Sequence, residues 1–327
     1  MITIGHGAGG RLSKALIEEH FLPKFDNPAL HGLQDAGVVG DLAMTTDGYV
    51  VTPRFFPGGN LGRMAVAGTV NDLAMVGAIP IGLTASFFLE EGLAFDELDR
   101  IVDAMAATAR EARVSIVSGD TKVVPRGAVD GIFIATAGVG RISDDFKPDP
   151  VRIVPHDAII ISGPIADHGM AVMAARETLP LSGELESDVA PIACLVERLR
   201  SHAVEVHALR DPTRGGVAES LNAFASDAAV TIVLNEPDLP VRPSTRMACE
   251  LLGIDPLHVA NEGKLLAVIP EAQAERAVSA LRSHPLGQHA TIIGAVEAGK
   301  PRLVLKTHLG TRRIVRMPEG EILPRIC

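Results

Sequence analysis

Aromatic residues are nearly absent from this sequence. It contains no tryptophan, one tyrosine and only 3% aromatic residues in a chain of 327 residues. The hydrophobic fraction is nevertheless 47% and the charged fraction 21%, so a packed core is easily built from Ala, Val, Ile and Leu. This composition is typical of mixed α/β proteins, and the length indicates two domains of ordinary size.

Cysteine is also scarce. The three cysteines are Cys194, Cys249 and Cys327, and they form no Cys-x-x-Cys motif, which excludes a disulfide framework. Cys194 and Cys249 lie in apolar, helix-like sequence, where we expect small buried hydrophobic side chains. Cys327 is different because it is the last residue of the chain.

The sequence lacks an uninterrupted membrane span, a leader and a basic cluster. The apolar stretch at 64–88 is broken by Asn71, Asp72 and Pro80. No basic segment followed by an apolar run opens the chain, so no signal peptide is expected. The net charge of −10 argues against nucleic-acid and membrane partners, and suits a protein that holds cations between carboxylates. We therefore expect a cytoplasmic protein.

The segment 317–327 reads Met-Pro-Glu-Gly-Glu-Ile-Leu-Pro-Arg-Ile-Cys. Pro318, Gly320 and Pro324 oppose both helix and sheet hydrogen bonding, so we expect an extended and mobile tail. At roughly 3.3 Å per residue, such a tail could move the Cys327 thiol through about 30 Å. The alternative is an ordinary disordered chain end that carries arbitrary residues.

Two glycine-rich turns open predicted helices. The first spans residues 5–10, which hold four glycines, and the second is Gly215-Gly216. Backbone N–H groups in such turns can approach an anion, with a helix N-terminus behind them. The first turn is not a P-loop because Arg11 and Leu12 follow it instead of Lys and Ser or Thr. A merely flexible N-terminus remains the alternative.

Strand and helix patterns alternate along both halves, which predicts an α/β (α+β) fold. A Pro- and Asp-rich stretch at 142–156 separates the halves. We expect an N-terminal domain at 1–146, a C-terminal α/β domain at 147–316 and the tail at 317–327. The elements that matter below are strands at 35–39, 42–51 (broken at 45–48), 81–89, 114–117 and 131–140, and helices at 12–21, 62–77, 95–111, 189–202 and 217–226. The segment Ser-Gly-Asp-Thr-Lys at 118–122 is predicted to turn out of the short buried strand at 114–117.

Five aspartates are candidates for one acidic site. Two carboxylates about 5 Å apart repel by roughly 3 kcal/mol at an effective dielectric constant near 20, so a cluster would bind protons or cations. Oxygen ligands of this kind suit Mg²⁺, which commonly holds substrate phosphates as well. Each aspartate taken alone could equally be a turn residue. They are Asp47, Asp72, Asp120 and Asp211, with Asp35 as a possible fifth.

Seven motifs together resemble the HypE family, the carbamoyl dehydratases of nickel–iron hydrogenase maturation. The likeness covers essentially the whole chain in the same order, and its Pro-Arg-Ile-Cys ending is highly specific. The acidic motifs alone indicate only the wider superfamily of aminoimidazole ribonucleotide synthetase, selenophosphate synthetase and thiamine-monophosphate kinase. The motifs are Thr-Thr-Asp-Gly-Tyr-Val-Val-Thr-Pro at 45–53, Phe-Phe-Pro-Gly-Gly at 55–59, Ala-Gly-Thr-Val-Asn-Asp-Leu-Ala at 67–74, Gly-Asp-Thr-Lys-Val-Val at 119–124, Asp-Pro-Thr-Arg-Gly-Gly at 211–216, Asn-Glu-Gly at 261–263 and Pro-Arg-Ile-Cys at 324–327.

The resemblance implies a two-domain aminoimidazole ribonucleotide synthetase-like fold whose N-terminal domain dimerises through its sheet. ATP would lie in the cleft between the domains. A carbamoyltransferase, HypF, would load a carbamoyl group onto the Cys327 thiol, and ATP would drive its dehydration to a thiocyanate. The cyanide group would then pass to iron on a HypC–HypD scaffold.

The expected site residues come from the matched motifs, from the glycine-rich turn at 5–10 with Arg11, and from the set of five aspartates. Cys327 would carry the group, Glu262 is our candidate base, and Lys122 would orient the tail or assist proton transfer. ATP would be contacted by Gly7, Gly9, Gly10, Arg11, Asn71, Gly119, Thr121, Gly215 and Gly216. Mg²⁺ would be held by Asp35, Asp47, Asp72, Asp120 and Asp211.

Two other functions remain open at this point. The chain could be an ATP-dependent small-molecule kinase or synthetase of the same superfamily, with an idle tail. It could also be a binding module whose terminal thiol carries a metal or docks a partner. Lys122 and Glu262 would then be an ordinary solvated pair. Arg325 could offset the carboxylate beside the thiol or contact a partner.

Overall fold

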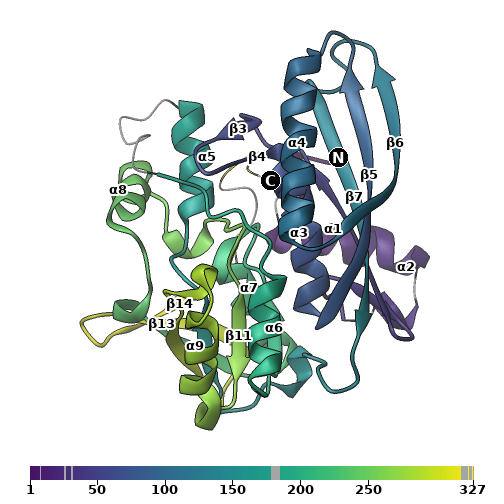
Figure 1. Cartoon of the computed structure of the whole chain (residues 1–327). Coiled ribbons are helices and arrows are strands. Elements are labelled where there is room, and N and C mark those ends of the chain that lie inside the picture. The colour runs from purple at the N-terminus through teal and green to yellow at the C-terminus, as the bar shows by residue number, and fades with distance from the viewer. Residues whose placement is uncertain are drawn as a thin grey trace.

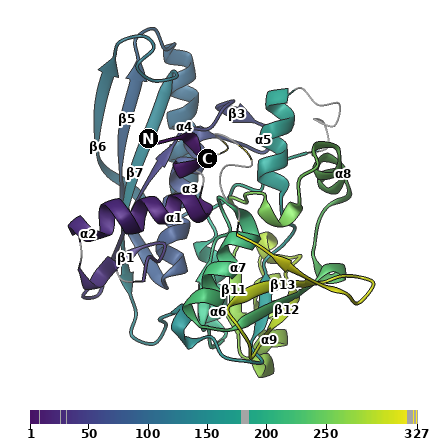
Figure 2. The ribbon, with the colours of Figure 1, turned by 180° about the vertical axis from the view of Figure 1, so that it is seen from behind.

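Two β-sheets, each covered by helices, form the two halves of the chain (Figures 1 and 2). The structure is a computed structural model that describes residues 1–7, 9–25, 27–30, 32–177, 185–317, 323 and 326. No helix within these residues is long and apolar enough to cross a membrane. This arrangement confirms the predicted two-domain α/β fold.

The first sheet has five strands in the order β1-β2-β7-β5-β6, and only β5 and β6 pair in parallel. Helices α3 and α4 cover one face. The N-terminal helical run, from α1 to α2, lies behind the molecule in Figure 1 and in front in Figure 2. The bounds are β1 (Gly37–Val39), β2 (Leu42–Tyr49), β5 (Ala78–Glu90), β6 (Ser115–Val124), β7 (Ile132–Ile142), the small hairpin β3 (Phe55–Phe56) and β4 (Gly59–Asn60), α1 (Gly10–Leu16), a π-helical turn (Ile17–Phe21), α2 (Leu22–Phe25), α3 (Leu61–Met75) and α4 (Phe95–Glu111).

The second sheet has seven strands in the order β14-β13-β10-β12-β8-β11-β9. Strand β8 is buried along its whole length: Ile159 and Ile161 pack in the same core cluster as α7, and Ile160 packs with α6 and α9. A continuous apolar run is what a sheet covered on both faces requires. The bounds are β8 (Ala158–Ile161), β9 (Ala208–Arg210), β10 (Thr231–Asn235), β11 (Leu266–Ile269), β12 (Thr291–Glu297), β13 (Arg302–Lys306), β14 (Arg312–Val315), α5 (Asp167–Glu177), α6 (Ala193–Ser201), α7 (Gly216–Asp227), α8 (Pro243–Leu252) and α9 (Ala274–Arg282). Short 3-10 turns lie at Ile4–Gly7, Pro28–Leu30, Pro150–Arg152, Glu236–Asp238, Pro256–His258, Glu271–Gln273 and Pro285–Gly287.

Two local predictions in the first sheet are wrong. β2 runs unbroken through residues 45–48, because that segment pairs residue by residue with β7. The segment 118–122 is not a turn but the middle of β6, an exposed edge strand that continues to Val124. Its pairing with β5 holds Gly119 and Asp120 in extended backbone, which sequence signals for a turn did not anticipate.

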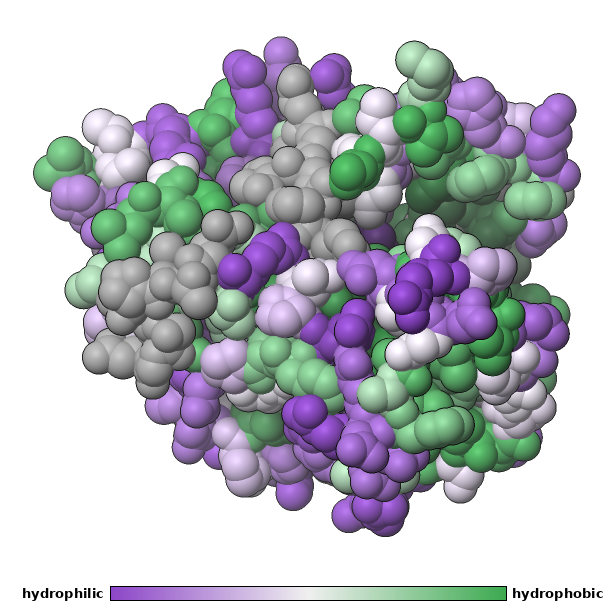
Figure 3. Space-filling view, turned by 90° about the horizontal axis from the view of Figure 1, so that it is seen from above, coloured by the Kyte–Doolittle hydropathy of each residue, from purple (hydrophilic) through white to green (hydrophobic). Residues whose placement is uncertain are grey.

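The face of the first sheet opposite α3 and α4 is exposed and apolar. Along β7 the side chains alternate, so that Ile134 is buried while Val139 is 38% exposed. Met44 on β2 lies opposite Val139 and is 45% exposed, and Ile81 in β5 is 52% exposed. Seen from above, apolar side chains gather on the right of Figure 3, the side on which β6 lies in Figure 1. We call this surface the open face.

A segment of the second half, residues 185–192, lies against the first half, and we call it the strap. Asn71, only 1% exposed on α3, donates from Nδ2 to the Ala190 carbonyl (3.1 Å) and accepts from the Ile192 amide (2.8 Å). Arg63 Nε donates to the Val189 carbonyl at 2.8 Å. The two sheets are therefore held together by side chains of α3 that satisfy buried main-chain groups of the strap.

Two residues of the predicted tail lie within the described part of the chain. Leu323 and Ile326 are 7% and 5% exposed, and both belong to the core cluster that joins the domains. Cys327 lies outside the described residues. Mobility of the tail and the expected domain limits stay predictions. Among the internal cysteines, Cys249 is buried as predicted, whereas Cys194 is only partly buried.

Replacing Asn71 with Ala should destabilise the protein by about 2–4 kcal/mol, because the substitution leaves a buried carbonyl and a buried amide without partners. Urea unfolding monitored by circular dichroism measures the change. The exposed Gln288, replaced with Ala, is the control and should shift the midpoint little. Equal effects of the two substitutions would contradict the role of Asn71 as the link between the domains.

Candidate functional site

Four of the five candidate aspartates gather where the two domains meet. Asp47 lies in β2 on the side that faces α3, since it pairs with the buried Thr136 of β7. Asp72 is on α3 and accepts a hydrogen bond from Thr45 Oγ1 at 2.8 Å. Asp35 precedes β1, and Asp211 follows β9 in the second domain. Elements of both domains therefore supply this group.

Burial and mutual repulsion act on these carboxyls. The pKa of Asp72 is raised well above its usual value, first by burial and then by the charges of Asp211, Asp35 and Asp47. The pKa of Asp211 is raised in the same way, by burial and then by Asp35. Asp211 is 5% exposed, and its Oδ2 has no hydrogen-bond partner among the described residues. Such a group favours either protons or a bound cation.

Glu262 joins the same electrostatic group from the second domain. It is 3% exposed, and its pKa is raised well above the usual value by burial and then by the charges of Asp211, Asp47 and Asp188. A raised pKa makes a carboxylate a stronger base than an exposed one. The structure thus brings Glu262 into the same electrostatic group as Asp211 and Asp47, and its catalytic role stays a prediction.

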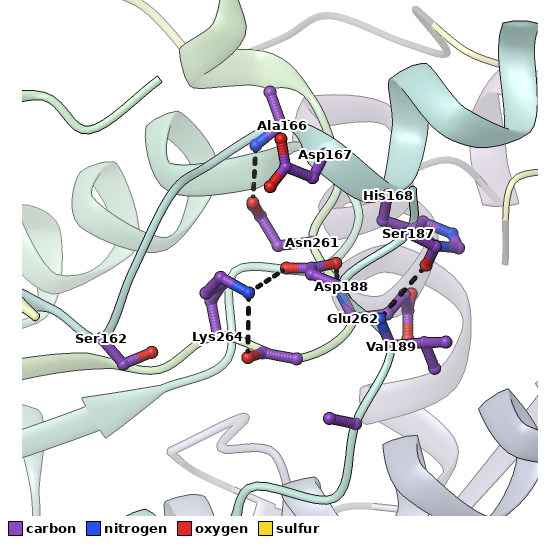
Figure 4. Close-up of polar contacts among 12 residues, drawn as sticks. Ser162, Ala166, Asp167, His168, Ser187, Asp188, Val189, Asn261, Glu262 and Lys264 are labelled. Carbon is purple, nitrogen blue, oxygen red and sulfur yellow. Dashed lines mark hydrogen bonds and ion pairs between the residues drawn. The ribbon is translucent and has the colours of Figure 1, made fainter. Parts of the chain in front are cut away.

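A buried polar network holds the loop that carries Glu262 (Figure 4). Asp188 Oδ1 accepts from the Glu262 amide at 3.0 Å, and Asp188 Oδ2 pairs with Lys264 Nζ at 2.9 Å. Asn261 is fully buried: its Oδ1 accepts from the Ala166 amide at 2.8 Å and its Nδ2 donates to the Pro212 carbonyl at 2.9 Å. These contacts fix the main chain on both sides of Glu262 and next to Asp211.

The two glycine-rich turns lie against each other. Arg214 Nη1 donates to the Gly7 carbonyl at 2.8 Å. A Cβ atom on Gly9 would come within 2.6 Å of Glu219 Oε2, and one on Gly215 would come closer still, so both positions require glycine. A pocket of about 540 Å³ opens here, lined by Gly7, Gly9, Gly10, Asp35, Asp211 and Arg214 among others. Gly216 opens α7 beside it, and Arg11 is exposed at the start of α1.

The structure does not bring Asp120, Gly119, Thr121 and Lys122 to this group within one chain. Asp47 on β2 pairs with Thr136 on β7, which pairs with Ala85 on β5, which pairs with Gly119 on β6. Gly119 is therefore three strand spacings, or about 14 Å, from Asp47 across the sheet. Alternation of side chains puts Asp120 and Lys122 on the open face, where they pair at 2.9 Å and are 60% and 61% exposed. Within one chain, the predicted convergence of Asp120 with the other acids is wrong because these residues continue an edge strand.

The side chain of Asn71 binds the main chain of the strap, a structural contact that the sequence did not predict. Its amide is occupied by the strap, so its assigned contact with ATP stays a prediction without support from these hydrogen bonds. Sequence reasoning missed two acidic residues, Asp188 and Glu219. Burial raises the pKa of Glu219, and its Oε2 has no hydrogen-bond partner among the described residues. Neither acid stands in a turn motif, so only the fold reveals them.

The donor set fits Mg²⁺ in chemical type. The carboxylates are hard oxygen ligands, and the partnerless Asp211 Oδ2 is a buried acceptor that a cation would satisfy. Among the described residues, however, no three acidic, histidine or cysteine side chains already stand close enough together to hold a metal ion. A cation would therefore be bound jointly with a ligand that supplies further oxygens.

Comparison with known proteins defines the class first. The family model of the AIR synthase related protein N-terminal domain matches residues 33–142, and that of the C-terminal domain matches residues 154–306. The chain is therefore an AIR synthase related protein, with both domains of that family in order.

Individual relatives narrow the class. The carbamoyl dehydratase HypE of Rhizobium leguminosarum bv. viciae is 48% identical over 334 residues, covering 100% of this chain and 95% of that protein. The crystal structure of a HypE–HypF complex superposes with a TM-score of 0.89 and 47% identity, over 93% of this chain and 100% of that one. The crystal structure of HypE in complex with ATP superposes with a TM-score of 0.85 and 47% identity, over 98% of each chain. The chain belongs to the HypE carbamoyl dehydratases, which confirms the family predicted from the motifs.

Replacing Asp72 with Asn should stabilise the protein at pH 8, because the variant removes the cost of ionising a buried carboxyl beside like charges. The folded-state pKa of Asp72 is raised, so the wild type loses stability as pH rises through it and regains stability as pH falls. The gain should therefore shrink at pH 5. Thermal unfolding at both pH values measures it.

Asp41, exposed on the same sheet beside Arg141 at 3.5 Å, is the control, and its replacement with Asn should give no such pH-dependent gain. Destabilisation by Asp72→Asn that is equal at both pH values would contradict the repulsion described above.

Proposed function

We propose that this chain uses ATP to dehydrate a carbamoyl group carried on the thiol of Cys327, giving a thiocyanate that supplies the cyanide ligand of the hydrogenase iron. The observation that supports this most strongly is the position of Ile326, the residue before Cys327. It is buried at the domain junction, and its carbonyl accepts from His168 Nε2 at 2.7 Å. Ile326 is thus held beside the strap, whose Asp188 binds the loop that carries Glu262.

The chemistry explains the need for ATP. The carbamoyl oxygen cannot leave a carbon as oxide, but it can leave as phosphate once the γ-phosphoryl group is attached to it. The nitrogen gives up its two protons, the C–O bond breaks and the carbon–nitrogen triple bond forms. The products are the thiocyanate, ADP and inorganic phosphate, and the atoms balance. Glu262 is the base that we assign to the nitrogen, because it is a buried carboxyl whose pKa is raised, which makes it a stronger base than an ordinary carboxylate.

Residue assignments follow the geometry. Asp47, Asp72 and Asp211, with Asp35 beside them, would hold Mg²⁺, which when bound supplies positive charge to the phosphates. The Gly7–Gly10 and Gly215–Gly216 turns would face the phosphates with main-chain N–H groups. In support, Gly7, Gly9 and Gly10 of the first turn line the same cavity as Asp35 and Asp211, and so does Arg214, which directly precedes the second turn.

A homodimer would complete the site. Asp120 and Lys122 lie on the open face of one chain, and contact between two copies would bury that face and carry both residues to the partner's junction. The exposed apolar side chains Met44, Ile81 and Val139 support the contact. The carbamoyl donor partner would be the HypF carbamoyltransferase, the cyanide acceptor the HypC–HypD scaffold, and the setting the cytoplasm.

Mass spectrometry of the C-terminal peptide tests the reaction. The protein carbamoylated at Cys327, by the transferase or by cyanate, should lose one water from that peptide only when ATP and Mg²⁺ are present. Deletion of Cys327 distinguishes the proposed dehydratase from the alternative, an ATP-dependent small-molecule kinase or synthetase. If ATP-dependent turnover of a small substrate survives the deletion, the chain is a kinase or synthetase with an idle tail. ATP consumption without any change in the carbamoylated peptide points the same way.

Glu262→Gln should slow this water loss by about 10²–10⁴-fold while leaving the fold intact, because the amide keeps the shape and removes only a base. Single-turnover assays on the carbamoylated protein measure the rate. The exposed carboxylate Asp238, replaced with Asn, is the control and should react like the wild type. A wild-type rate in Glu262→Gln would remove Glu262 from the mechanism.

Val139→Asp should convert a dimer into a monomer, because it places a charge at the centre of the apolar open face. Light scattering after size exclusion gives the mass in solution. Val151, 70% exposed but outside the sheet, is the matched control, and Val151→Asp should stay dimeric. A monomeric wild type, or a dimeric Val139→Asp variant, would contradict dimerisation through this sheet.

A further inference from the structure

His168 occupies a place in the structure that the assigned chemistry does not use. It lies in the first turn of α5 and is fully buried. Its ring meets the ring of Phe56 edge-on, with centroids 5.5 Å apart. Figure 4 shows its side chain beside Ser187 of the strap, in the row of polar residues that continues to Asp188 and Glu262.

Both ring nitrogens of His168 have partners, and the partners define the proton's position. Nε2 is 2.7 Å from the Ile326 carbonyl oxygen, which can only accept, so Nε2 carries the proton. Nδ1 is 2.8 Å from Ser187 Oγ, and that oxygen accepts from the Val189 amide at 3.1 Å. The Ser187 hydroxyl can therefore donate to Nδ1. One directed chain of hydrogen bonds runs from Val189 through Ser187 and His168 to Ile326.

This chain is satisfied by a neutral imidazole. Ser187 Oγ has one donor hydrogen and two acceptor lone pairs, so its contact with Nδ1 is met by a neutral ring. Burial lowers the pKa of His168, although the nearby Asp188 charge opposes the shift. The contact with Ile326 places a proton on Nε2, and burial favours the neutral form of the ring.

Leu323, the second described residue of the tail, makes an apolar contact near His168. Leu323 packs over Gly169, where an added Cβ would come within 3.2 Å of Leu323 Cδ1 and 2.5 Å of Val259 Cγ1. Apolar contacts favour a buried tail but do not fix its position along its own axis. The hydrogen bond to Ile326 does fix it, because a shift by one residue would remove the carbonyl from Nε2.

The strap connects the hydrogen bonds of His168 to the rest of the site. The Ser187 amide donates to the Pro57 carbonyl of the first domain at 2.8 Å, and the next residue, Asp188, accepts from the Glu262 amide. The ring of His168 thus stands between the tail on one side and, on the other, a segment that contacts both the first domain and the predicted base.

We infer that His168 is a positioning residue: it latches the C-terminal tail in its docked register through the carbonyl of Ile326, immediately before the residue that carries the carbamoyl group. The latch itself rests only on the described contacts. Its consequence for the rate rests on the proposed function, since the register of Ile326 sets where the next residue begins.

Hydrogen–deuterium exchange of the C-terminal peptide in the full-length protein tests the latch without ATP or a carbamoyl group. His168→Phe keeps the aromatic packing and removes the donor, and a lost hydrogen bond of this kind corresponds to about tenfold in the docked-to-released ratio. The peptide should therefore exchange about tenfold faster. His168→Gln, whose side-chain amide can reach the position of Nε2, should restore slow exchange. His289→Phe, at an exposed histidine, is the matched control and should exchange like the wild type.

Two outcomes of the exchange experiment overturn the latch: equal exchange in His168→Phe and His289→Phe, or no rescue by Gln. Turnover separates this claim from the proposed function. His168→Phe should lower kcat for water loss about tenfold, with KM for ATP unchanged and with rescue by Gln. If the wild type never loses water, the proposed function falls and the exchange result still decides the latch.

A second measurement decides the case even if His168→Phe does not fold. In the wild type labelled with nitrogen-15 histidine, the His168 ring should give the signals of a neutral Nε2–H tautomer with a slowly exchanging proton. Removal of residues 318–327 should make that proton exchange rapidly. A ring protonated on Nδ1, or a signal indifferent to the truncation, would overturn the latch.

Discussion

Repulsion between carboxyl groups buried at the domain junction is the constraint on which the rest of this structure depends. Asp72 and Asp211 come from different domains. The charge of Asp211 raises the pKa of Asp72, and the charges of Asp35 and Asp47 raise the pKa of both. Left to itself, such a group would push the domains apart. It is retained because the surrounding contacts are rigid, and because a cation with phosphate oxygens would relieve it.

The contacts that oppose this repulsion are short and mainly to the main chain. Asn71 binds the strap from α3, and Asn261 binds the turns at Ala166 and Pro212. The Asp188–Lys264 pair is buried and neutral overall, so it fixes the Glu262 loop without adding net charge. Stability is therefore concentrated around a group that is itself unfavourable, which is the usual arrangement of a site prepared for ligands.

Much of this could be predicted from the sequence. The alternation of strand and helix patterns predicted the two-domain α/β fold, and the motifs and their order along the chain predicted the family. Aspartates in glycine turns and a polar pair in an apolar helix pointed to Asp47, Asp72 and Asp211. The pairing of strands could not be predicted from the sequence. Residues 118–122 are of types common in turns, yet their pairing with β5 keeps them extended. The extended backbone places Asp120 and Lys122 on the open face. Asp188, Glu219 and His168 stand in no motif, so only their neighbours in space reveal them.

The tail connects these observations to function. A single sequence showed a thiol at the end of a proline-interrupted segment, and the fold shows that Leu323 and Ile326 of that segment are buried between the domains. Under the proposed function, a carrier group on Cys327 would therefore follow directly after a residue that already lies at the domain junction.

Calorimetry of ATP binding with Mg²⁺, performed at pH 7 in two buffers of different ionisation heat, tests the central claim most directly. Burial and repulsion raise the pKa of these carboxyls, and a cation bound beside them lowers it again, so binding is coupled to proton release. The account predicts proton release on binding, which should be reduced in Asp72→Asn. Binding without proton release, or release that is unchanged in that variant, would contradict it.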